Sequence, residues 1–139
     1  MISYYDGYID GLFNLASSVS KNIGPSFIRA SLYDKDKFYK EFKKNYRLKD
    51  NVMNIVETKW SFKQVLHEWL DDEHLEESIL YWINLKFGKN IKVLASDNDQ
   101  IIDQLSGYAG GVSGFYFVED IYFIEYDKYM LVLIMGNNE

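Results

Sequence analysis

The pattern of hydrophobic and polar positions divides the chain into a helical first part and a strand-rich last part. Apolar residues recur at helical spacing from about Tyr8 to Lys21, and this predicts a helix that ends before Pro25. Its expected core stripe consists of Ile9, Leu12, Phe13, Ala16 and Val19. After an irregular segment, Asp34 is a suitable N-cap for a second helix that extends to about Tyr46.

A third helix has a clear start signal, because Ser61 and Gln64 fit the S-x-x-Q capping box. Its apolar stripe is Phe62, Val65, Leu66, Trp69 and Leu70. A further pattern follows, with Gly88 in C-cap position and a stripe at Leu75, Ile79, Trp82, Ile83 and Leu85. Relative to the stripe of the third helix, this second stripe is rotated about the helix axis by roughly a quarter turn, taking ~100° per residue. We therefore expect a break around residues 71–73, where Asp71 or Asp72 caps a new helix.

The C-terminal part carries strand patterns instead. Lys89–Ala95 predicts a strand and Asp99–Leu105 a short helical turn, and Phe115–Met135 predicts three strands joined by tight turns near residues 119–120 and 127–128. The last strand is apolar on both faces, which indicates that it is central or covered on both sides. The expected fold is α+β, a single domain over residues 1–139, with a helical N-terminal two-thirds packed on a small, mainly antiparallel C-terminal sheet.

Composition and charge limit the function classes. The chain of 139 residues has no cysteine, so disulfides, thiolate nucleophiles and cysteine-ligated zinc are excluded. It shows neither a secretory signal nor an apolar run long enough for a membrane span, and we expect a cytoplasmic protein that binds no membrane. The net charge of −6 argues against nucleic-acid binding. Residues 1–50 carry nine basic and six acidic side chains, net +3, and residues 51–139 carry six and 15, net −9.

The stretch HEWLDDEHLEE, residues 67–77, holds both histidines and six acidic residues. On one continuous helix, His67, Asp71 and His74 would share a face and form an acceptable metal-ligand array. The predicted break removes that shared face, so we expect neither a metal nor a cofactor here.

The acidic residues of this stretch are caps and solvated positions in the simplest interpretation. Six carboxylates in ten residues also repel one another, and a basic partner would relieve that repulsion. Aromatic residues are favoured anchors at interfaces. The residues expected to contact such a partner are Glu68, Asp71, Asp72, Glu73, Glu76, Glu77, Tyr122 and Tyr126.

The glycine-rich passage GYAGGVSG, residues 107–114, lacks both the phosphate-binding pattern GxxxxGK[ST] and the nucleophile-elbow pattern GxSxG. Gly107, Gly110, Gly111 and Gly114 are interpreted as positions of positive φ in a loop that enters the sheet. No catalytic residue is identified. Two alternatives stay open: a small enzyme or ligand-binding domain with a pocket near residues 107–114, and a homo-oligomeric regulatory module.

The passages YYDGYIDGLFNLASS and VLHEWLDDEHLEESILYWINLKFG, with the closing strand and its GNNE end, resemble small bacterial immunity proteins. These are cytosolic antitoxins of contact-dependent growth inhibition and related polymorphic toxin systems. The resemblance extends over the whole chain in general character and includes no motif, so no functional residue is carried over from it. It implies a non-enzymatic protein that binds a cognate, basic toxin domain and neutralises it.

Overall fold

The computed structural model describes residues 2–19, 26–89, 92–97, 100–109 and 117–137. Within these residues the chain forms five α-helices, one short 3-10 helix and five strands. The helices are α1 (Ile2–Val19), α2 (Phe38–Tyr46), η1 (Asp50–Val52), α3 (Phe62–Leu70), α4 (Glu73–Phe87) and α5 (Gln100–Ala109). The strands are β1 (Ser26–Asp34), β2 (Ile55–Glu57), β3 (Lys92–Ser96), β4 (Phe117–Glu125) and β5 (Tyr129–Asn137).

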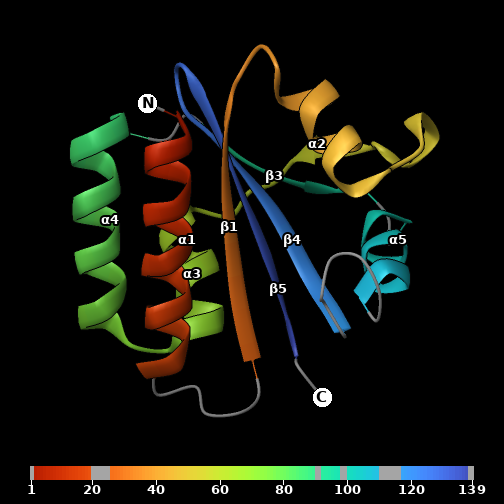
Figure 1. The fold of residues 1–139 in the computed structure, drawn as a ribbon. Helices are drawn as coiled ribbons and strands as arrows, with labels where there is room; N and C mark the ends of the chain where they lie inside the picture. The colour runs from red at the N-terminus through yellow and green to blue at the C-terminus, as the bar shows by residue number, and fades with distance from the viewer. Residues whose placement is uncertain (1, 20–25, 90–91, 98–99, 110–116, 138–139) are drawn as a thin grey trace.

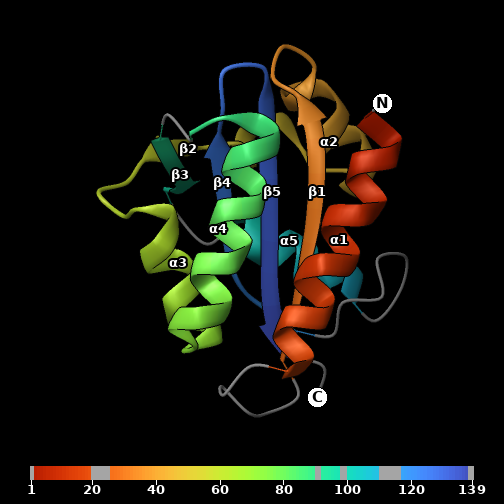
Figure 2. The ribbon, with the colours of Figure 1, turned by 90° about the vertical axis from the view of Figure 1, so that its left-hand side faces the viewer.

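The sheet lies between two layers of helices (Figures 1 and 2). Its strand order is β1-β5-β4-β3-β2, and each neighbouring pair is antiparallel. Helices α1, α3 and α4 cover one face, and α2 and α5 cover the other. Side chains of β5 alternate between the two cores: Leu131, Leu133 and Met135 face the first layer, and Met130, Val132 and Ile134 face the second. The prediction that the last strand is covered on both sides is confirmed.

The α+β class is confirmed, but the expected division into N-terminal helices and a C-terminal sheet is wrong. Strand β1 occupies the segment expected to be irregular, and it pairs with β5 along its whole length. Its inner residues, Ile28, Ala30 and Leu32, join the core beneath α1. Asp34 ends this strand and does not cap a helix, because α2 begins only at Phe38, after an N-cap at Lys37.

The exposed edge of β1 is covered by a carboxylate from α1. The Ala30 N–H donates to Asp10 Oδ1 at 2.8 Å, and Arg29 Nε donates to both oxygens of Asp10 at 3.0 and 3.1 Å. Unpaired strand edges present free donors to other chains. The Asp10 side chain thus satisfies an edge donor that no neighbouring strand can reach.

Strand β4 is continuous where the sequence predicts two strands and a turn. The ladder between β4 and β5 shifts register between Val118 and Asp120, so Glu119 is the additional residue of a bulge. This residue explains why Val118, Ile121 and Phe123 all belong to the core under α2 and α5, which strict alternation would not allow. The other predicted turn, between β4 and β5, is confirmed.

Helices α3 and α4 agree closely with the sequence prediction. Ser61 Oγ accepts from the Gln64 N–H at 3.1 Å, and Gln64 Oε1 accepts from the Ser61 N–H at 2.7 Å, which confirms the capping box. Every member of the predicted α3 stripe is buried. Gly88 is confirmed as the C-cap of α4, with a φ of 80°, whereas Leu85 lies on the surface and not in the core. In the described part of the chain, no helix combines the length and apolar content needed to cross a membrane.

Candidate functional site

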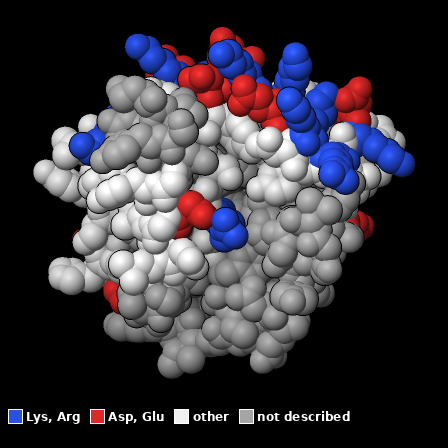
Figure 3. Space-filling model, in the orientation of Figure 1, with Lys and Arg blue, Asp and Glu red and all other residues white. Residues whose placement is uncertain are grey.

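The basic residues around α2 and the acidic residues between α3 and α4 lie apart in the folded molecule. Lysine and arginine side chains gather over α2, at the upper right of Figure 3, with some acidic side chains among them. The exposed basic residues of this segment are Lys37, Lys40, Lys44, Arg47 and Lys49. The connection between α3 and α4 lies at the opposite end of the molecule and over the other face of the sheet (Figures 1 and 2). The charge asymmetry of the sequence is therefore also an asymmetry in space.

The corner between α3 and α4 is produced by a change of backbone conformation at Asp71. Helix α3 ends at Leu70, and Asp71 takes a left-handed φ of 47°, which few non-glycine residues adopt. Asp72 then caps α4 by accepting the Leu75 N–H at 3.2 Å. The predicted break is confirmed, and Asp72 is the residue that caps the new helix.

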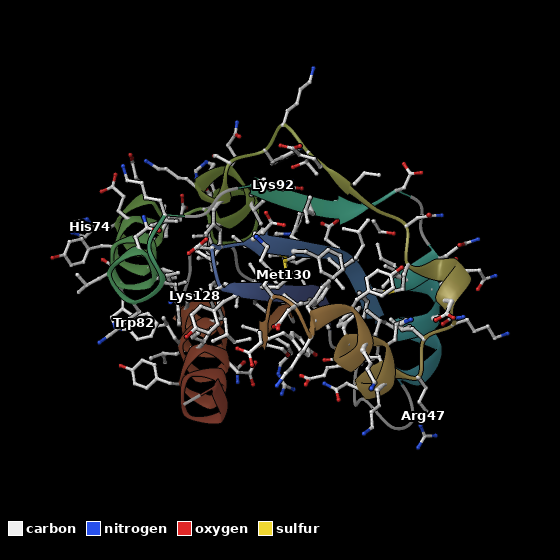
Figure 4. The ribbon with its side chains drawn as sticks, turned by 90° about the horizontal axis from the view of Figure 1, so that it is seen from above. Arg47, His74, Trp82, Lys92, Lys128 and Met130 are labelled. Carbon is white, nitrogen blue, oxygen red and sulfur yellow. The ribbon has the colours of Figure 1, made fainter. Side chains whose placement is uncertain are left out.

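The two histidines lie on different helices as a result. His67 belongs to α3, and His74 belongs to the first turn of α4, where it lies on the outer side of the helix (Figure 4). Among the residues with described positions, no group of three or more His, Asp or Glu side chains is placed to hold a metal ion.

Glu76 is a buried carboxylate, although the sequence analysis placed it on the partner-binding surface. Its side chain is 0% exposed, so that expectation is wrong for Glu76. Its Oε2 accepts the Asp72 N–H at 2.7 Å, and both of its oxygens lie 3.1 Å from His67 Nδ1. A buried carboxylate requires such donors, because burial removes its hydration. Together these contacts connect the end of α3 to the start of α4.

The His67 imidazole is held between two carboxylates. Its Nδ1 donates to Glu76, and its Nε2 lies 3.7 Å from Asp71 Oδ1. An imidazole oriented by a buried carboxylate is also the geometry of a general base. Here the second ring nitrogen faces another carboxylate, and no described serine or threonine hydroxyl is hydrogen-bonded to it. The contact between His67 and Glu76 connects α3 to α4.

The remaining carboxylates surround this buried contact, and we call Glu68, Asp71, Asp72, Glu73 and Glu77 the acidic corner. All are exposed except Asp72, which is half-buried. Lys63 Nζ lies 3.4 Å from Glu77 and 3.7 Å from Glu73. The hydrogen bond to Glu77 raises the pKa of Lys63, and the negative charges of Glu77 and Glu73 add to the effect. Within the described residues, Glu68 has no cation partner.

A groove of about 560 Å³ runs beside the acidic corner. Its lining includes Trp60, Lys63, Gln64, His67, Glu68 and Glu73. The Trp60 side chain is 44% exposed and stands one residue before the N-cap of α3. Trp60 is not among the binding residues predicted from the sequence. Its position outside the apolar stripe of α3 is the sequence signal that could have indicated its exposure.

The two tyrosines expected as anchors lie below the surface. Tyr126 is 0% exposed, and burial raises its pKa, so the expectation that it contacts a partner is wrong. Tyr122 is only 9% exposed, and its ring centroid lies 6.5 Å from that of Trp60. Burial raises the pKa of Tyr122 to about 12, and the charges of Asp120 and Glu68 contribute. Tyr122 thus supports the exposed Trp60 from beneath.

A second aromatic surface lies across α1 and α4. The rings of Tyr8 and Trp82 stack with centroids 5.0 Å apart and an interplanar angle of 19°. Figure 4 shows Trp82 on the side of α4 that faces α1. Tyr8, Leu15, Tyr81 and Leu85 are exposed large hydrophobic residues of these two helices.

The glycine-rich passage contributes little to the described structure. Gly107 lies within α5, so the expectation of a loop at that position is wrong. Gly110, Gly111 and Gly114 lie outside the described residues, as does any pocket that they would line.

The comparisons with known proteins add no family. A scan against protein-family models and searches of curated proteins and solved structures found no match. Function is accordingly inferred from the chemistry of the corner and its groove.

Proposed function

We propose that this chain is a non-enzymatic immunity protein, which binds and neutralises a cognate toxin domain with a basic surface. The observation that carries this proposal is the acidic corner, where exposed carboxylates stand beside an exposed tryptophan over a rigid helix junction. Carboxylates steer and orient a basic partner, and an aromatic side chain supplies contact energy when it is desolvated. The resemblance of the chain to small immunity proteins points to the same mode of action.

The rigidity of the corner supports a binding function. Glu76 and the Asp72 cap hold the backbone of the corner between α3 and α4 before any partner arrives. A surface that is ordered before binding loses less conformational entropy when the complex forms. The basic residues of α2 lie far from this corner, so they do not screen it.

The gene for the partner should lie next to the gene for this protein. An upstream gene for a large secreted toxin provides the candidate, and its C-terminal domain can be co-expressed with this protein. We expect a stable complex and protection of the producing cell. Affinity should fall as salt concentration rises, because screening weakens exposed charge pairs.

Charge reversal tests the role of the corner directly. The double variant Glu68→Lys with Glu73→Lys should weaken the complex by roughly tenfold at low salt, since each exposed pair contributes up to about 1 kcal/mol. Glu41→Lys, an exposed position on α2, is the matched control and should leave the affinity unchanged. Thermal melts would verify that the variants fold. An affinity that responds neither to salt nor to the double variant would refute the electrostatic mechanism.

A further inference from the structure

We propose that the groove beside Trp60 receives an arginine side chain of the protein partner. This inference depends on the proposed function for the identity of the partner, but the groove can be tested without that partner. Three features of the groove support it: an aromatic wall, a negative balance of charge and a carboxylate that lacks a cation among the described residues.

The wall of the groove is held in place by β3. The Trp60 backbone N–H donates to Thr58 Oγ1 at 3.2 Å. The Thr58 backbone N–H and hydroxyl both donate to the Val93 carbonyl, at 2.9 and 3.0 Å. The Trp60 ring also packs near Tyr122 from β4. The backbone that carries Trp60 is therefore anchored, its ring lines the groove, and an indole face attracts organic cations.

The charge of the groove favours a cation. Its exposed lining includes two carboxylates, those of Glu68 and Glu73, and one ammonium, that of Lys63, so negative charge is in excess. Glu73 already pairs with Lys63, and Glu76 is buried against His67. Glu68 is the carboxylate that no described cation neutralises. Glu68 and Trp60 both line the groove, so the carboxylate and the indole flank one site.

Arginine fits this combination better than lysine. The guanidinium is planar, so it can stack on the indole while its N–H groups donate to a carboxylate at the side. A lysine ammonium is more strongly hydrated and is not flat. The volume of about 560 Å³ leaves room for the backbone that carries the arginine. The basic side chains of α2 cannot reach the groove from within the same molecule, because they lie at its other end.

The groove can be tested with a pair of short peptides. Acetyl-Gly-Arg-Gly-amide is the probe, and acetyl-Gly-citrulline-Gly-amide is its neutral control of nearly the same shape. Titration of the ¹⁵N-labelled full-length protein would follow the indole signal of Trp60, assigned from its loss in Trp60→Phe, and the ring of His67. We expect saturable shifts with the arginine peptide and at least about fivefold weaker binding of the citrulline peptide.

Variants localise the binding. Glu68→Gln should weaken the arginine peptide by about two- to fivefold, the range for one exposed charge pair. Trp60→Ala, followed through the His67 ring, should weaken it by a similar factor. Glu41→Gln is the matched control and should have no effect. Equal shifts with both peptides, or none with either, would overturn the proposal. A dimer that forms at high concentration and is abolished by Trp60→Ala would assign the groove to a second copy and overturn it as well.

Failure of this inference can be distinguished from failure of the proposed function. A toxin complex that forms with unchanged affinity in Trp60→Ala would refute the arginine site and leave the immunity function standing. Binding of the arginine peptide without any toxin complex would support the arginine site and refute the immunity function.

Discussion

The buried carboxylate of Glu76 gives a sharp prediction about stability. In Glu76→Ala, the Asp72 N–H loses an acceptor at 2.7 Å, and His67 loses the acceptor for its Nδ1–H. A hydrogen bond to a charged group contributes about 1.5–3 kcal/mol, and an unsatisfied buried donor costs about 1–3 kcal/mol. His67 is largely exposed and can turn toward water, so most of the loss arises at Asp72. We expect a decrease of about 2–3 kcal/mol in the free energy of unfolding.

The measurement is a urea titration combined with thermal unfolding. For a domain of this length, a loss of 2–3 kcal/mol lowers the melting temperature by roughly 6–10 °C. The slope of the urea transition should stay unchanged, because the surface exposed on unfolding is the same. Glu76→Gln should lose less than Glu76→Ala, since its amide oxygen can still accept the Asp72 N–H.

The neighbouring residue provides the control. Glu77 is exposed and pairs with Lys63 on the surface, so Glu77→Ala should change stability by less than about 1 kcal/mol. If Glu76→Ala is no more destabilising than Glu77→Ala, the carboxylate does not hold the corner together, and the reasoning is wrong.

Three further predictions follow from buried or edge groups. Tyr126→Phe should raise stability by about 1 kcal/mol in thermal melts, because within the described residues the buried Tyr126 hydroxyl has no hydrogen-bond partner. Burial raises the pKa of Tyr122 from 10.0 to about 12, so its contribution to stability is complete below pH 10 and is lost as the pH rises through 12. Alkaline melts should therefore show a smaller loss of stability over this range in Tyr122→Phe. Asp10→Ala should lower stability by about 1–2 kcal/mol in urea titrations, because the Ala30 N–H at the sheet edge loses its acceptor. An Asp10→Ala variant as stable as the parent protein would contradict that role.

The location of the acidic corner was predictable from the sequence, but the direction of its side chains was not. The phase change between the two apolar stripes revealed the break at residues 71–73, and the carboxylates around it were identified. Glu76 lies three residues before Ile79 and shares its buried face, a spacing that could have indicated burial. The backbone next to Trp60 is held by contacts of Thr58 with Val93, far along the chain.

The amino-acid sequence by itself determined the features that depend on neighbouring residues. The Ser61 capping box, the stripe of α3 and the Gly88 cap each form within one or two turns of helix, so their signals lie side by side in the sequence.

Only the tertiary structure decided the features that depend on distant residues. Strand β1 becomes a strand because β5, at the other end of the chain, provides its hydrogen-bond partners. The ladder between β4 and β5 accommodates Glu119 as a bulge where the sequence alone indicated a turn. Backbone pairing between remote segments leaves no local signature, since the donors and acceptors are the same for every residue.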